Sequence, residues 1–235
     1  MKHYVILLLF MLMYNGTTAQ IRDYSKVVQK DFNWGFRTGF TATNSNFYQI
    51  YQKDTEIGGN IINQAGFQYT VFGRINLGKF FLQPDLGYYL IREKHHLNLP
   101  IIDSNTQQEL TRNVVLGKSS QSLNAAMLLG YNVVKSDAYI FNFYLGPNFR
   151  YNYVDKYEYN INDSFDKRNP EHKLNLVAGV SANISYFHID FKYEVNIPAK
   201  SNTSFSGMVD APDYLKNISI QETKNILSFS LGMMF

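Results

Sequence analysis

The chain of 235 residues has no cysteine, few charged residues and, beyond its first segment, no long apolar run. The absence of cysteine excludes disulfide bonds, zinc–thiolate centres and thiol catalysis. Charged residues make up 17% of the chain, and the formal net charge is only +3. Because the basic residues are also scattered, we predict no nucleic-acid partner. Downstream of residue 20, no segment approaches the roughly 20 apolar residues that a membrane-spanning helix needs.

The first segment has the layout of a secretory signal peptide. Lys2 precedes an apolar run from Tyr4 to Tyr14, and small residues lead to a predicted cut after Ala19. A membrane anchor is the alternative, but this run falls short of the roughly 20 apolar residues of a spanning helix. We therefore predict a cleaved signal peptide over residues 1–19 and export through the inner membrane.

Alternation with a period of two residues dominates the chain from Phe32 onward. Aromatic residues are abundant at 16%, which favours strands because their rings fit a pleated surface. Each alternating segment is roughly 10–14 residues long, which suits a tilted membrane-crossing strand better than a strand of a soluble sheet. The eight segments are 32–44, 64–78, 80–90, 122–133, 139–153, 173–184, 187–197 and 225–235.

The connections between these segments alternate between short and long. Three are tight, with the sequences GK, VKSD and SY, and the other four are polar loops of about 20 residues. Short periplasmic turns and long outer loops are the layout of bacterial outer-membrane barrels. We predict an all-β fold, an eight-stranded antiparallel up-and-down transmembrane β-barrel over residues 32–235, preceded by a short periplasmic segment, 20–31. The long loops are expected near 45–63, 94–118, 155–172 and 198–222.

Alternation alone leaves open which face of the strands points inward. A soluble barrel of the lipocalin kind would bury its apolar face. Here the polar face is rich in glycine, which suits a narrow barrel interior filled by side chains. The apolar face carries almost no charge, and its aromatic residues stand near strand ends, as girdle residues do at the two membrane interfaces. We therefore predict lipid outside the apolar face and a girdle of Trp34, Tyr88, Tyr131, Tyr139, Tyr151, Tyr153 and Phe235.

The hairpin GRINLGKFFLQPDLGYYL (73–90), the signal ending in Ala-Gln and the terminal strand ending in Phe235 resemble the PorT-like outer-membrane β-barrel family. The resemblance spans the chain from about Phe32 and implies residence in the cell outer membrane. It also implies insertion by the barrel-assembly machinery, contact with outer-membrane lipid and lipopolysaccharide, and a possible partner in a secretion complex. It identifies an architecture better than an activity, because one member type serves secretion and gliding while most have no assigned role.

The inward face carries charged side chains from most of the strands. Buried charges must be paired to be tolerated, so we predict an ion-pair network that plugs the barrel. The alternative is a charged conduction path, but eight strands leave little free interior. The predicted network comprises Arg37, Arg74, Asp85, Arg150, Asp190, Lys192 and Glu194, and Lys173 and Lys224 share its face.

Catalytic and metal-binding patterns are weak. No nucleophile elbow, HExxH motif or phosphate-binding loop occurs. The adjacent pair His95-His96 diverges in a strand and has no third ligand at a useful spacing, so we predict no metal site and no cofactor. We expect a non-enzymatic envelope scaffold, surface-binding or secretion-associated component, with a small passive pore or an outer-rim enzyme as alternatives. The rim candidates for catalysis would be His95, His96, Asp103, Ser119, Ser120 and His172.

Overall fold

A computed structural model describes most of the chain from residue 30 onward. The described residues are 30–53, 55–102, 109–136, 139–159, 163–167, 170–197, 201–205, 211–212 and 214–235. The predicted signal peptide and nearly all of the predicted periplasmic segment lie outside them. Within these ranges, the structure has no helix with the length and apolarity needed to cross a membrane.

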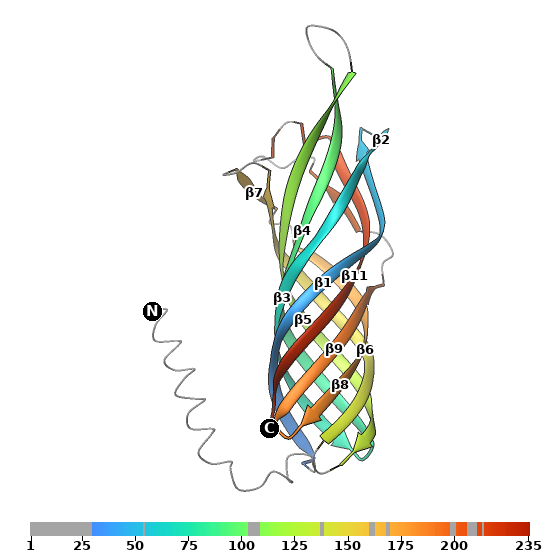
Figure 1. Ribbon diagram of the computed structural model, residues 1–235, viewed down its shortest axis with the longest axis vertical. Helices are drawn as coiled ribbons and strands as arrows, with labels where there is room; N and C mark the ends of the chain where they lie inside the picture. The colour runs from blue at the N-terminus through green and yellow to red at the C-terminus, as the bar shows by residue number, and fades with distance from the viewer. Residues whose placement is uncertain are drawn as a thin grey trace, which may run out of the picture.

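The described chain is an all-β, antiparallel sheet of eleven strands (Figure 1). Eight are long and three have only three or four residues. The short strands form inside segments predicted as loops, so the sheet has more strands than the eight expected. The strands are β1 (Phe32–Gln52), β2 (Thr55–Ile57), β3 (Gly59–Leu77), β4 (Phe80–Ile102), β5 (Glu109–Lys135), β6 (Tyr139–Glu158), β7 (Ser164–Lys167), β8 (Glu171–Ile184), β9 (Phe187–Asn196), β10 (Ser201–Ser204) and β11 (Ile218–Met234).

Each long strand pairs with two others. The order β11-β9-β8-β6-β5-β4-β3-β1 follows the chain backwards, and β1 also pairs with β11. This last ladder runs from Gly35 opposite Met234 to Gln52 opposite Ile218. At its lower end the backbones of Trp34 and Phe235 exchange two hydrogen bonds, of 3.1 and 2.8 Å. The C-terminal residue therefore belongs to the seam between the last and first strands.

The tight turns follow the sequence prediction, whereas the long loops do not. The GK and SY turns join β3 to β4 and β8 to β9, and Gly78 and Ser185 within them adopt positive φ angles of 68° and 54°. The predicted loop 94–118 is instead mostly strand, because β4 and β5 stay paired out to Ile102 opposite Glu109. The predicted loops at 45–63, 155–172 and 198–222 are likewise partly strand.

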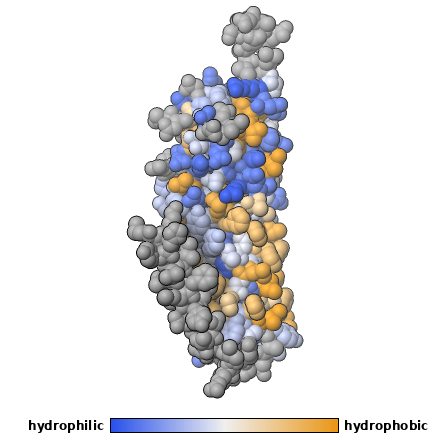
Figure 2. Space-filling model, turned by 60° about the vertical axis from the view of Figure 1, so that its left-hand side comes forward, coloured by the Kyte–Doolittle hydropathy of each residue, from blue (hydrophilic) through white to orange (hydrophobic). Residues whose placement is uncertain are grey.

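The apolar face points outward over the lower part of the sheet, as predicted. Leu86 is 68% exposed and Leu129 57%, whereas polar residues on the opposite face are buried. Hydrophobic residues gather on the lower half of the molecule and hydrophilic ones above (Figure 2). We call this apolar outer surface the belt, and it includes Trp34, Phe40, Tyr69, Leu86, Leu129, Phe143, Leu145, Phe187 and Leu231.

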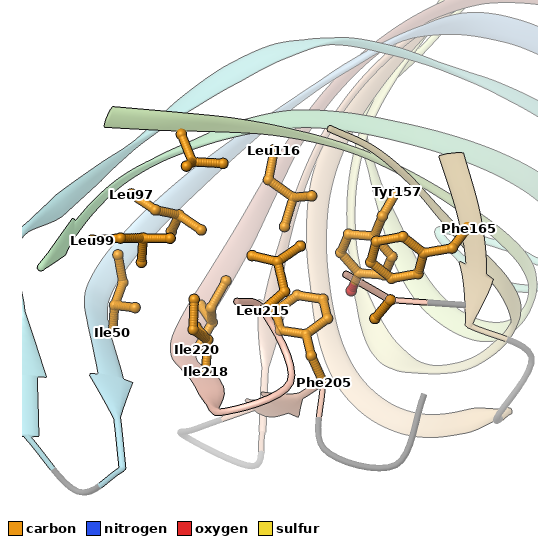
Figure 3. Packing of buried hydrophobic residues seen from close by; sticks show 12 residues of the cluster. Ile50, Leu97, Leu99, Leu116, Tyr157, Phe165, Phe205, Leu215, Ile218 and Ile220 are labelled. Atoms are coloured by element: carbon orange, nitrogen blue, oxygen red, sulfur yellow. The ribbon is translucent and has the colours of Figure 1, made fainter. Parts of the chain in front are cut away.

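Above the belt, the outward residues change from apolar to polar. We call this upper part of the sheet the extension. Its inner face is apolar at the top, where twelve buried residues pack together (Figure 3). The ring of Tyr157 stacks on Phe165 at 5.2 Å and meets Phe205 edge-on at 5.1 Å. We call this cluster the cap; its members are Ile50, Leu97, Leu99, Val114, Leu116, Tyr157, Phe165, Phe205, Ala211, Leu215, Ile218 and Ile220.

Candidate functional site

The centre of the lumen holds a guanidinium between two carboxylates. Arg37 on β1 lies 2.5 Å from Asp85 on β4 and 3.6 Å from Asp190 on β9. The hydroxyl of Tyr144 on β6 donates to Asp190 at 2.6 Å. Four strands are therefore linked across the interior, and three of the residues predicted for the network meet here. All of these side chains are buried.

Arg74 reaches this group through an amide. It donates twice to Gln83, at 2.9 and 2.7 Å, and Gln83 donates to Asp85 at 2.9 Å. Its guanidinium also lies over the ring of Phe81, 4.1 Å from the ring centre, which is an attractive cation–π arrangement. Among the described residues, no ion pair of Arg74 with a carboxylate is found within 4.0 Å. The glutamine link was not part of the sequence prediction.

The remaining predicted members lie higher in the lumen. Arg150 donates to Glu194 at 2.6 Å, and Asn148 and Asn175 donate to the same carboxylate oxygen at 2.9 and 2.5 Å. Lys192 donates to the hydroxyl of Tyr89. The predicted network thus forms two groups, one around Arg37 and one around Glu194.

Aromatic rings fill much of the space between these charges, a feature that the sequence prediction missed. Phe72, Phe81 and Tyr144 point inward, and the sequence prediction had assigned these three rings to neither face. Each stands opposite a glycine of the neighbouring strand. A Cβ atom on Gly130 would lie 2.0 Å from the ring of Phe81, so only glycine leaves room for that ring. The paired residues are Phe72 with Gly35, Phe81 with Gly130 and Tyr144 with Gly179. The sequence shows both the rings and the glycines, but only the register between strands shows which ring faces which glycine.

A second polar cluster lies above the belt, just below the cap. Lys224 on β11 contacts Glu93 on β4 at 2.5 Å and Glu222 at 2.6 Å. His95, two residues after Glu93, places its Nε2 atom 3.9 Å from a Glu93 oxygen. Lys118 on β5 lies 3.6 Å from Glu222. We call Glu93, His95, Lys118, Glu222 and Lys224 the upper cluster.

The upper cluster stands outside the belt. The last apolar outward residue of the belt is Leu90 on β4, Leu123 on β5 and Leu227 on β11. His95 lies five residues beyond this edge, in the extension. Burial lowers the pKa of His95 to about 4, even though Glu222 and Glu93 act to raise it. The imidazole is therefore neutral at neutral pH.

A small cavity separates the upper cluster from the group around Glu194. Its volume is about 30 Å³, which is room for roughly two or three water molecules. Arg150 and Glu194 line its lower side, and Lys118, Lys173 and Lys224 contribute ammonium groups. A chamber of this size is too small to be a substrate pocket.

The predicted catalytic candidates do not converge. His95 is buried in the lumen, while His96 and Ser119 point to the outer face and Ser120 points inward. His172 stacks on the rings of Phe149 and Tyr151 on the outer surface. Asp103 lies outside the described residues.

The predicted girdle residues stand on the outer face. Trp34 and Tyr139 are about half exposed. The ring of Phe235 lies 4.9 Å from that of Trp34, and Tyr131 contacts Phe80 at 5.1 Å. The others, Tyr88, Tyr151 and Tyr153, are partly buried by their neighbours.

The arrangement of an apolar belt around a polar, filled lumen agrees with the comparison against protein families. The model of the outer membrane protein beta-barrel domain matches residues 18–203, which is most of the chain. This chain belongs to that family. The outer membrane is accordingly the location that its membership indicates. Comparison with curated proteins finds no match.

Solved structures with a similar course of the chain include several outer-membrane proteins. OprG of Pseudomonas aeruginosa is 11% identical with a TM-score of 0.48, covering 88% of this chain and 97% of its own. Ail of Yersinia pestis, solved with a heparin analogue, is 10% identical with a TM-score of 0.40. The match covers 88% of this chain and 100% of the Ail chain. The protease OmpT of Escherichia coli is 8% identical with a TM-score of 0.43. The match covers 87% of this chain and 96% of the OmpT chain. These likenesses are too distant to indicate a specific role.

Proposed function

We propose that this protein is a non-enzymatic scaffold or surface-binding component of the outer membrane, built as a closed barrel of eight membrane-crossing strands with a plugged lumen. The eight long strands would cross the membrane, and β2, β7 and β10 would stand outside it. The ladder between β1 and β11 supports closure, because a sheet in lipid must leave no unpaired edge. The belt supplies the lipid-facing surface.

The observation that carries the proposal is the bridge of Arg37 between Asp85 and Asp190. It joins strands from different sides of the interior, and all three side chains are buried. An open aqueous pore would leave these groups hydrated, whereas here they satisfy one another. Rings such as Phe81 and Tyr144 occupy the space beside them, and the cap covers the upper end.

The extension supports a role at the cell surface. Long, paired strands carry a polar outer face well above the belt, where polar loops were expected. A rigid, water-exposed wall of this kind suits contact with lipopolysaccharide or with a protein partner. The resemblance of the hairpin 73–90 to the PorT-like family supports an envelope-assembly or secretion complex as that partner. Insertion would use the barrel-assembly machinery.

Conductance in planar lipid bilayers tests the plug. We expect no steady conductance in the nanosiemens range from the refolded wild-type protein, because the lumen is filled. A porin added to the same membrane afterwards is the control for an intact, recordable bilayer. Steady nanosiemens steps from the wild-type protein would establish the passive pore and reject the plugged scaffold.

Crosslinking in intact envelopes tests the surface role. We expect photo-crosslinkers placed at Asn98 or Asn113, both exposed in the extension, to capture envelope partners or lipopolysaccharide. The matched control is a crosslinker at Leu129 in the belt, which should capture phospholipid. Equal products from the extension and the belt would contradict a surface-binding role.

A further inference from the structure

The upper cluster contains a set of metal-ligating side chains that the protein's fold assembles from two distant strands. Glu93, His95 and Glu222 each offer one ligand atom, and these three atoms all lie within 4.8 Å of one another. Glu93 and His95 are neighbours on the inner face of β4, whereas Glu222 comes from β11, more than a hundred residues later. All three residues are about 1% exposed.

The decisive observation is that each of the three residues has an unused polar atom. Oε1 of Glu93, Nε2 of His95 and Oε2 of Glu222 are buried and have no hydrogen-bond partner among the described residues. A buried carboxylate oxygen or imidazole nitrogen without a partner is costly. A cation bound by Nε2 of His95 and by one oxygen of each carboxylate, once small rotations turn the unpartnered oxygens toward it, would remove that cost.

Lys224 leaves these atoms available. It contacts Oε2 of Glu93 and Oε1 of Glu222, which are the other oxygens of the two carboxylates. It therefore holds the carboxylates in place and does not occupy their remaining oxygens. Lys118 contacts Asp155 and Glu222 in the same way, and Lys173, which pairs with Glu171, lines the adjoining cavity.

His95 has the partner that a metal-binding histidine needs. Its Nδ1 atom lies 3.0 Å from the hydroxyl of Tyr48. When Nδ1–H donates to that oxygen, the lone pair of Nε2 points to the carboxylates. Metal-ligating histidines almost always use their second nitrogen in this way, and the bond fixes the tautomer and the ring orientation.

The geometry points to a divalent transition-metal site formed by Glu93, His95 and Glu222, with zinc as the ion of best fit. One imidazole and two carboxylates are ligands that zinc accepts, and three protein ligands leave a fourth position for water. With bonds of about 2.0–2.2 Å, the ligand atoms would need to approach one another by small rotations of the two carboxylates. The ion would lie beneath the cap and tie β4 to β11.

Metal content after refolding tests this site directly. The full chain is refolded from urea into detergent with ZnCl₂, freed of loose metal, and its zinc is measured by mass spectrometry. We expect about one zinc per wild-type chain and none in H95N or E222Q. H96Q is the matched control, because His96 is adjacent but points outward, and it should keep its zinc. Heat-dependent gel mobility verifies that each variant is folded.

Cobalt gives a readout that does not depend on the variants. Co²⁺ bound to the wild-type protein should show visible absorption of a low-symmetry site, and excess ZnCl₂ should abolish it while MgCl₂ should not.

Y48F should weaken zinc binding by about tenfold, because the imidazole loses its positioning partner. Tyr48 is a positioning residue, so the cobalt spectrum of Y48F should keep the wild-type shape at saturation.

Lys224 separates a metal site from an ion-pair cluster. K224M removes a positive charge beside the ligands, so zinc should bind on the order of tenfold more tightly and restore the stability lost in the variant. A purely structural ion-pair cluster predicts loss of stability that zinc does not restore, and this outcome would overturn the site. Wild-type protein without zinc, or equal zinc in wild type and E222Q, would overturn it as well.

Discussion

The belt and the extension use the same strands with opposite chemistry. On β5, Leu129 points outward in the belt and is 57% exposed, while Asn124 points inward and is buried. Higher on the same strand, Leu116 points inward and is fully buried, and Asn113 points outward. The alternation of directions is continuous, so only the polarity of the two faces changes. In the proposed membrane placement, hydrocarbon would surround the belt and water would surround the extension, and each solvent would select its own outer surface.

The two regions also fill their interiors differently. The lumen inside the belt is held by paired charges and rings, whereas the upper end of the extension has an ordinary apolar core, the cap. The upper cluster lies at the transition between them. This difference can be tested by substitutions that should act in one region and be silent in the other.

The largest effect is expected inside the belt. Arg37→Met would leave Asp85 and Asp190 buried without their shared partner, so the free energy of unfolding should fall by about 3–5 kcal/mol. Urea-induced unfolding in lipid vesicles measures it. Lys156→Met is the control, because Lys156 and Glu158 form an exposed pair in the extension and its loss should change little. Equal stability of R37M and wild type would show that the central bridge does not hold the lumen together.

The cap should respond to the loss of apolar volume. Leu116→Ala would open a cavity in a fully buried site and lower the free energy of unfolding by about 2–5 kcal/mol. Hydrogen exchange should rise in the upper parts of β4 and β5 and stay unchanged around Leu129. If exchange rose equally in both regions, the extension would not be a separate packing unit.

A lysine on the outer face should be harmful in the belt and harmless in the extension. Leu129→Lys places a charge against hydrocarbon and should cost up to about 2–4 kcal/mol near the bilayer centre. Val115→Lys lies on the same face of the same strand, is 43% exposed and meets water, so its stability should match wild type. Folding into vesicles, followed by gel mobility and urea titration, compares the two. A similar loss in both variants would place Val115 within the membrane.

Much of the belt was predictable because its evidence is local. Alternation over 80–90 or 187–197 states directly which residues share a face, and glycines on the polar face indicate which face is inside. The turns at Gly78 and Ser185 followed from the spacing of the strands. The prediction failed over 94–118 because polar outward and apolar inward residues there alternate in the opposite sense, and their polarity was interpreted as that of a loop.

The candidate site was only partly predictable. Charged residues of the network could be assigned to the inward face, but Arg74 pairs with Gln83, and this choice depends on geometry across a turn. The pair His95-His96 was dismissed because its side chains diverge and no third ligand stands at a useful spacing. In the structure His95 is instead grouped with Glu93 and with Glu222 from β11, and no spacing rule connects residues that meet only across a lumen.

The amino-acid sequence by itself determined the eight alternating segments, their tight turns and which residues of a segment share a face, because a period of two residues is a local property of the backbone. The tertiary structure alone decided which charges meet, how rings settle over glycines and how β4 and β11 bring Glu93, His95 and Glu222 together. Those contacts depend on the stagger between strands and on the curvature of the whole sheet, which are collective properties that no short segment encodes.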